Sequence, residues 1–185
     1  TTITSPTTIS QSGVYCLANS INGPININAS NVILDLNGHS VSNPGSNGIS
    51  SSNQSKITIR NGTIQNSIRG IYFQSVANSV VERCSFTGNT TGIELVSSHQ
   101  TIIQDCVATA NSITGYSLIN SSTNCIINCT ALSNGIAGSG NTYGFVSQEG
   151  SGNTFTGCKA ENTQTVSLGY WDVAAGFAFI GSESC

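Results

Sequence analysis

The sequence predicts an all-β solenoid, a parallel β-helix of about six to seven coils with roughly 22–23 residues per coil. One observation is a Gly followed by an apolar or aromatic residue at steps of 22, 22, 23, 29 and 32 residues, at Gly48, Gly70, Gly92, Gly115, Gly144 and Gly176. A second is a cysteine series that lengthens with it: Cys84, Cys106, Cys129 and Cys158. A fixed period of this size is typical of units that bury their apolar faces by stacking on their neighbours.

Within each repeat we expect short strands and no helix, which is the third observation behind the fold. Ile57 and Ile59 alternate with Thr58, the period of two expected when successive side chains face opposite sides of a strand. Asn, Gly and Ser interrupt these segments and favour turns. About 22 residues accommodate three short strands and three corners. Equivalent strands then stack into parallel sheets, and the rest of each coil supplies the crossover.

The interior of the solenoid is predicted as columns of aligned side chains. One column is Leu36, Ile59, Val81, Ile103, Ile126 and Phe155, and another is Val41, Ile64, Phe86, Ala108, Ala131 and Ala160. The four thiols of Cys84, Cys106, Cys129 and Cys158 form a third. Large and small residues compensate one another between columns, as a core of constant density requires.

A single domain over residues 1–185 is expected, because the repeat leaves no room for a linker. Residues 1–30 are assigned to an N-terminal strand or cap and the first coil. The regular coils occupy residues 31–135. Residues 136–185 form longer coils with loop insertions and a C-terminal cap.

The repeats resemble a known superfamily, the right-handed parallel β-helices of pectate-lyase-like proteins. The segments Gly13–Ile21, Ile25–Ile27 and Asn31–Val41 look like the first coils of such domains, and the later repeats are similar to their degenerate coil motif. The resemblance covers nearly all of the chain and implies a right-handed, single-stranded β-helix. The superfamily includes polysaccharide lyases, polygalacturonases and phage tailspikes, so the resemblance implies fold more than function.

Composition excludes several partners. Charged residues make up 7% of the chain and the net charge is −3, so there is no basic surface for nucleic acid or an anionic membrane. No apolar run approaches the roughly 20 residues of a membrane span. The polar start is not a signal peptide. We therefore expect a secreted chain whose signal peptide has been removed, located outside the cell or on its surface.

Seven cysteines are an odd number, so at least one thiol stays free or pairs outside the chain. We interpret the four stacked cysteines as small, buried apolar residues. Stacked thiols do not make the tetrahedron that zinc prefers, and no metal site is expected. Cys16 and Cys185 near opposite ends are candidates for contacts between subunits, because a head-to-tail stack would bring them together.

Glycan-cleaving β-helices need paired carboxylates for hydrolysis, or a basic residue beside a carboxylate-bound calcium for elimination. Asp35, Asp105 and Asp172 fall in different columns of the aligned coils, which disfavours hydrolysis of the polygalacturonase type. The best charged group places Arg60 over Glu82 and Arg83 over Asp105, with Lys56, Arg69 and Glu94 nearby. A lyase could use these residues. The favoured reading is a set of ion pairs on an outer face.

The two long repeats carry extra loops with aromatic residues. Tyr143, Tyr170 and Trp171, with Asp172 beside them, are candidates for binding a sugar ring or a partner chain. The favoured alternative is that Trp171 covers the open end of the solenoid.

The function favoured by the sequence is a non-catalytic extracellular structural protein, a subunit that assembles into a surface filament, sheath or spike by end-to-end stacking. Copies of the chain would then be its partners, and no cofactor is expected. The alternative is a polysaccharide-binding or polysaccharide-cleaving domain of the lyase type, for which Ca²⁺ would be the cofactor. Ice binding is a third reading, which the absence of a regular threonine ladder disfavours.

Overall fold

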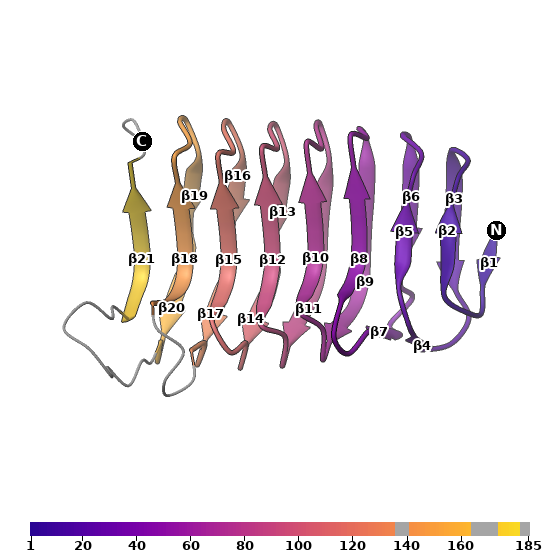
Figure 1. Ribbon diagram of the computed structural model, residues 1–185, viewed down its shortest axis with the longest axis horizontal. Helices are drawn as coiled ribbons and strands as arrows, with labels where there is room; N and C mark the ends of the chain where they lie inside the picture. The colour runs from indigo at the N-terminus through magenta and orange to yellow at the C-terminus, as the bar shows by residue number, and fades with distance from the viewer. Residues whose placement is uncertain (136–140, 164–173, 182–185) are drawn as a thin grey trace.

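The computed structural model describes residues 1–135, 141–163 and 174–181. These residues form a parallel β-helix whose coils are stacked along one axis, with strands β1 and β21 at opposite ends of the stack (Figure 1). All strand pairs between successive coils are parallel and nearly in register. The predicted fold class is confirmed.

One side of the solenoid is an eight-stranded sheet, sheet B, with one strand from each coil. Its strands in spatial order are β2 (Thr7–Ile9), β5 (Ile25–Ile27), β8 (Asn47–Ser52), β10 (Arg69–Gln74), β12 (Thr91–Val96), β15 (Thr114–Ile119), β18 (Thr142–Gln148) and β21 (Ala174–Ile180). Eight strands slightly exceed the six to seven coils predicted, because the short first coils lack the Gly-apolar pair by which the coils were counted.

The other strands form sheet A, which has 13 strands arranged in two rows. The first row is β1 (Thr2–Ile3), β3 (Gly13–Leu17), β6 (Val32–Asp35), β9 (Ile57–Gln65), β11 (Val80–Thr87), β13 (Ile102–Gln104), β16 (Cys125–Ile127) and β19 (Thr154–Thr156). The second row is β4 (Ile21–Asn22), β7 (Ser40–Ser42), β14 (Val107–Thr109), β17 (Thr130–Leu132) and β20 (Lys159–Glu161), and the long strands β9 and β11 run through both rows. Each regular coil therefore has the three strand segments expected.

The second predicted core column is correct along its whole length. Val41 pairs with Ile64, and the register continues through Phe86, Ala108, Ala131 and Ala160. In the first column the prediction of Leu36 was wrong, because Leu34 is the residue that pairs with Ile59. Six residues lie between Leu34 and Val41, whereas four lie between Ile59 and Ile64. The turn after β6 therefore contains two extra residues, which an alignment of uniform coils misplaces.

Buried side-chain amides fix the corner that leads into sheet B. Asn89, Asn111 and Asn134 are stacked inside consecutive coils. The Oδ1 atom of Asn111 accepts hydrogen bonds from the backbone N–H and the Nδ2 of Asn89 at 3.0 and 3.1 Å, and its own Nδ2 donates to the carbonyl of Phe86 at 3.1 Å. Because a buried amide without partners is costly, this ladder holds neighbouring coils in register.

Candidate binding surfaces

A row of charged and amide side chains crosses successive coils on the outside of sheet A. Asp35 pairs with Arg60, Arg60 with Glu82 and Glu82 with Gln104 in the register of β6, β9, β11 and β13. These residues alternate with buried apolar residues, so their side chains project outward. The sequence placed Arg60 over Glu82, and the register agrees.

A second set of polar residues lies beside this row, at the corner between the two rows of sheet A. Asn61, Arg83, Asp105 and Asn128 have φ values of 60°, 50°, 53° and 52°. Asn and Asp adopt this left-handed conformation more readily than other non-Gly residues, whereas Arg seldom does. The corner thus brings Asn61 and Arg83 next to the outward row. We call the combined set the charged ladder: Asp35, Arg60, Asn61, Glu82, Arg83 and Gln104.

The members of the charged ladder are joined by hydrogen bonds from coil to coil. Arg60 Nε lies 2.9 Å from Asp35 Oδ2, and Asn61 Nδ2 donates to Asp35 Oδ1 at 3.2 Å. Arg83 Nε donates to Asn61 Oδ1 at 3.0 Å, and Arg83 Nη2 lies 2.6 Å from Glu82 Oε1. Gln104 Nε2 completes the row by donating to Glu82 Oε2 at 3.0 Å.

Asp35 is held as a carboxylate. Burial acts to raise its pKa, but hydrogen bonds from the Asn37 backbone N–H, Asn61 and Arg60, with the charge of Arg60, leave the pKa of Asp35 below its ordinary value. An ionised group that already accepts several N–H donors is a poor proton acceptor at neutral pH. Asp35 is therefore suited to orienting its neighbours.

The charged ladder still offers groups to a ligand. The Arg83 side chain is 55% exposed. Arg60 bonds through Nε, and within the described residues no hydrogen bond is formed by its two Nη atoms. Arginine donors of this kind, beside carboxylate and amide oxygens, can bind hydroxyl groups, which both donate and accept hydrogen bonds.

Other predicted site residues lie elsewhere. Asp105 occupies the same corner as Arg83, and its Oδ1 atom accepts a hydrogen bond from Asn128 Nδ2 at 3.4 Å. The expectation that Arg69 and Glu94 are near Arg60 and Glu82 was wrong, because Arg69 and Glu94 belong to sheet B and the other two to sheet A. The alternation of polar and apolar residues within each strand was visible in the sequence. The sheet to which each strand belongs was not. Tyr143 is on β18, also in sheet B.

Three of the aromatic-loop residues, Tyr170, Trp171 and Asp172, lie outside the described residues, and so does Cys185. Cys16 is half-buried in β3. Within the described residues no group of three or more His, Cys, Asp or Glu side chains is placed to hold a metal ion. The same part of the chain contains no helix long and apolar enough to cross a membrane.

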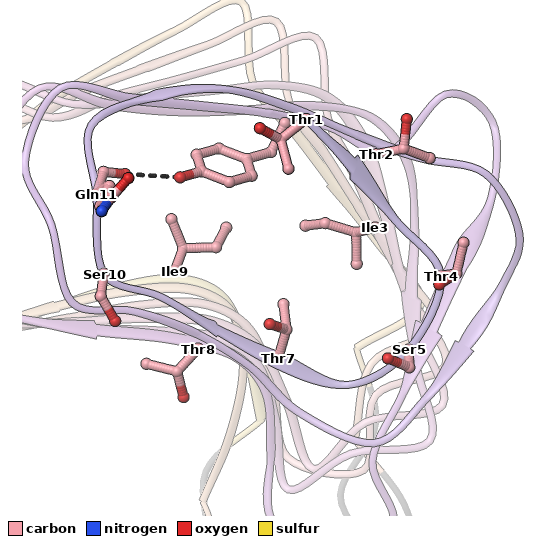
Figure 2. Close-up of a pocket in the computed structure, with 11 residues that line it drawn as sticks. Thr1, Thr2, Ile3, Thr4, Ser5, Thr7, Thr8, Ile9, Ser10 and Gln11 are labelled. Carbon is pink, nitrogen blue, oxygen red and sulfur yellow. Dashed lines mark hydrogen bonds between the residues drawn. The ribbon is translucent and has the colours of Figure 1, made fainter.

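A hollow of about 380 Å³ opens at the N-terminal end of the solenoid, inside the first coil (Figure 2). Its wall is rich in Thr and Ser hydroxyl groups, and Ile3 and Ile9 point into it. The Tyr15 hydroxyl donates to the carbonyl of Gln11 at 2.9 Å across one side. No Asp, Glu, Lys, Arg or His side chain lines the hollow.

The sequence of residues 23–183 matches the family described as the right handed beta helix region. The chain belongs to the right-handed β-helix family. The family match covers all of the coils that carry the charged ladder, and it gives the handedness of the solenoid. A search of curated proteins found no significant match.

Solved structures with a related fold include the periplasmic alginate epimerase AlgG, at a TM-score of 0.57 and 15% sequence identity. The alignment covers 92% of this chain and 43% of that protein, so this chain spans less than half of its length. The A-module of the mannuronan C-5 epimerase AlgE4 of Azotobacter vinelandii is aligned over 91% of this chain and 76% of the module, at 11% identity and a TM-score of 0.34.

The Streptococcus pneumoniae surface protein and adhesin PfbA is aligned over 91% of this chain and 69% of that protein, at 10% identity and a TM-score of 0.24. At these identities the similarity to AlgG shows a shared fold and no more.

Proposed function

We propose that this β-helix binds a polysaccharide along the charged ladder. The observation that carries the proposal is the continuity of the ladder, in which hydrogen bonds and ion pairs link partly exposed polar side chains from β6 to β13. The row follows the solenoid axis, and neighbouring strands are about 4.8 Å apart. A linear polymer lying along this axis would meet a polar side chain on each of these coils.

The chemistry of the ladder suits hydroxyl groups better than a strongly charged ligand. Two guanidinium groups and two carboxylates neutralise one another, and two side-chain amides add both donors and acceptors. The ion pairs also hold these side chains in place before a ligand arrives, which lowers the entropy lost on binding. A polyhydroxylated chain is therefore the ligand class that we favour.

The comparison with AlgG adds support of a weaker kind. That protein has the same fold and is an alginate epimerase located in the periplasm, so a β-helix of this kind serves a polysaccharide in at least one protein. A location outside the cytoplasm, where such polymers are found, is part of the proposal for this chain. Binding by Arg60, Glu82, Arg83 and Asp105 could also serve cleavage of the lyase type, with Ca²⁺ as cofactor.

The test is affinity electrophoresis of the full chain in gels containing alginate, polygalacturonate, laminarin or hydroxyethylcellulose. We expect at least one polymer to retard the protein, and Arg83→Ala to weaken that binding about tenfold, the effect of losing one or two charged hydrogen bonds. The matched control is Lys159→Ala, which also removes a cation from an exposed ion pair, in this case with Glu161.

Failure of every polymer to retard the protein, or equal effects of Arg83→Ala and Lys159→Ala, would overturn the proposal. Alginate and polygalacturonate, whose uronic acids carry the carboxyl group that elimination requires, are incubated with the protein with and without Ca²⁺, and the ultraviolet absorbance of the unsaturated product reports cleavage. A rise in absorbance that Arg83→Ala abolishes would assign a lyase activity to the ladder.

Self-association is a second candidate, and one observation favours it. At the C-terminal side of the stack, Phe177 and Phe179 of β21 are 40% and 49% exposed and pack around Phe155. Aromatic residues in this setting are suited to contact with another protein surface. Copies of the chain stacked end to end would cover them.

A further inference from the structure

The outer surface of sheet B shares no residue with the charged ladder, and two tyrosines project from it. Tyr72 is on β10 and Tyr143 on β18, and both side chains are half-buried. The strands β12 and β15 lie between them, so the two positions are three strand spacings, or about 14 Å, apart across the sheet. Tyr143 is in the register of Arg69, which is three residues, or about 10 Å, along the strand from the register of Tyr72. We call this surface the tyrosine face: Arg69, Tyr72, Glu94, Thr114, Ser117 and Tyr143.

The first tyrosine is held in place by an ion pair. The guanidinium carbon of Arg69 lies 4.8 Å from the centre of the Tyr72 ring, and Arg69 Nε lies 2.9 Å from Glu94 Oε1. Glu94 faces outward in β12, yet its side chain is only 12% exposed because it lies between these neighbours. The ring is thus oriented before any ligand binds, which reduces the entropy lost on binding.

Small polar residues surround the large side chains of the tyrosine face. Ser50 is the strand neighbour of Tyr72 on the side opposite Glu94, and its side chain is too small to cover the ring. Ser117 of β15 pairs with Glu94 and so continues the row that contains Tyr72. Thr114 of β15 pairs with Tyr143 of β18, in a different row. Thr114 and Ser117 are buried although they face outward. Larger side chains therefore stand on either side of a lower strip of small, buried polar residues.

We propose that the tyrosine face is a separate binding site for a neutral polysaccharide, with sugar rings stacked on Tyr72 and Tyr143. A sugar ring presents apolar C–H groups on its faces and hydroxyl groups at its edges, which matches an aromatic ring beside the polar groups of Arg69 and Glu94. Arg69 and Glu94 neutralise each other, so this surface has no unpaired charge among its described residues. A polymer with many carboxylates or sulfates would find no free cation here.

The test uses affinity electrophoresis of the full chain with two neutral polymers, laminarin and hydroxyethylcellulose, and with polygalacturonate as the anionic comparison. We expect Tyr72→Ala and Tyr143→Ala each to weaken binding of a neutral polymer by about tenfold. Tyr72→Phe keeps the ring and should stay within about twofold of the original protein. Val14→Ala, which shortens an exposed side chain on sheet A, is the surface control.

Circular dichroism and thermal unfolding identify any variant that fails to fold, and the other Tyr→Ala variant then carries the test. Arg83→Ala separates the two sites, because it removes a group from the charged ladder and leaves the tyrosine face intact. Retention of neutral polymer that survives both Tyr→Ala substitutions, or no retention of either neutral polymer, overturns the proposal. Loss of binding in Arg83→Ala with unchanged Tyr variants would assign the polymer to the ladder alone.

Discussion

The cysteine column shows how position in a coil sets the chemistry of a residue. The thiols of Cys106 and Cys129 are buried and lie 3.1 and 3.3 Å from the carbonyl oxygens of Gln104 and Ile127, to which they donate. The hydrogen bond with Cys106 and burial raise the pKa of the Cys129 thiol to about 12. For Cys106, the contact with Cys129 acts in the opposite direction, but the contact with Cys84 and burial raise its pKa to about 12.

These pKa values predict low thiol reactivity inside the solenoid. Because the thiolate is the nucleophile, iodoacetamide at pH 8 should alkylate Cys16 and Cys125, which are half-buried, well before Cys106 and Cys129. Peptide mass spectrometry before and after denaturation gives the modified fraction at each site. Equal rates at Cys125 and Cys129 in the folded protein would contradict the prediction.

The same raised pKa values make stability depend on pH in one direction. Above the ordinary thiol value of 9.0 the unfolded chain loses these protons first, while the folded chain keeps them to about pH 12. The unfolded state therefore binds fewer protons in this window, and the free energy of unfolding should fall as pH rises from 9 towards 12. Urea unfolding at several pH values measures this, and Cys129→Ala should reduce the slope.

The glycine column explains, at the scale of the strand, why a Gly precedes the apolar residue in each coil from β8 onward. A Cβ added to Gly92 would lie 2.5 Å from the carbonyl oxygen of Gly115 in the next coil and 3.0 Å from Phe86 Cβ. Coils cannot approach this closely with any larger residue. The apolar partners then stack inside, as in Tyr116 on Phe145, with ring centres 4.6 Å apart and planes 7° from parallel.

Gly92→Ala should therefore destabilise the protein by about 1–3 kcal/mol or more, the usual effect of overpacking. The matched control is Gly176→Ala in the last strand of the column, where the nearest atom to an added Cβ is Ala160 Cβ at 3.2 Å. Urea unfolding compares the two variants. Similar losses at both positions would mean that the contact between coils is not the reason for glycine.

At the scale of the whole molecule, each coil contacts only its neighbours, so the ends differ from the middle. The sequence predicted end-to-end assembly with Cys16 and Cys185 as possible contacts, and assembly stays a prediction. Electron microscopy at neutral pH, with and without reductant, is the measurement. Filaments or linear stacks would support self-association, and their loss on reduction would implicate cysteines. Discrete particles under both conditions would contradict it.

A polysaccharide on the charged ladder and linear assembly concern different parts of the molecule, so neither result decides the other. Gly92→Ala and the pH dependence likewise test the stability of the stack and not its function. The variants Arg83→Ala and Tyr72→Ala change exposed surface and are expected to leave the coil register intact. Comparing the two groups separates loss of binding from loss of fold.

The period of the sequence by itself determined the fold, because a solenoid repeats one local arrangement and each Gly, Cys and inward-facing residue records it. The column from Val41 to Ala160 was correct for this reason. The register of Leu34 was not predictable, since two extra residues in the turn after β6 change the alignment without breaking the alternation. Only the packed coil shows how such a turn is accommodated.

The candidate surfaces depended on the tertiary structure to a greater degree. The sequence brought Arg60, Glu82 and Arg83 together because they follow the same period. It could not separate Arg69 and Glu94 from them, because both sets alternate with apolar residues in the same way. The corners decide which sheet each strand enters. Tyr72 acquires its place beside Arg69 and Glu94 only when adjacent coils stack, since these contacts join residues that are distant in sequence.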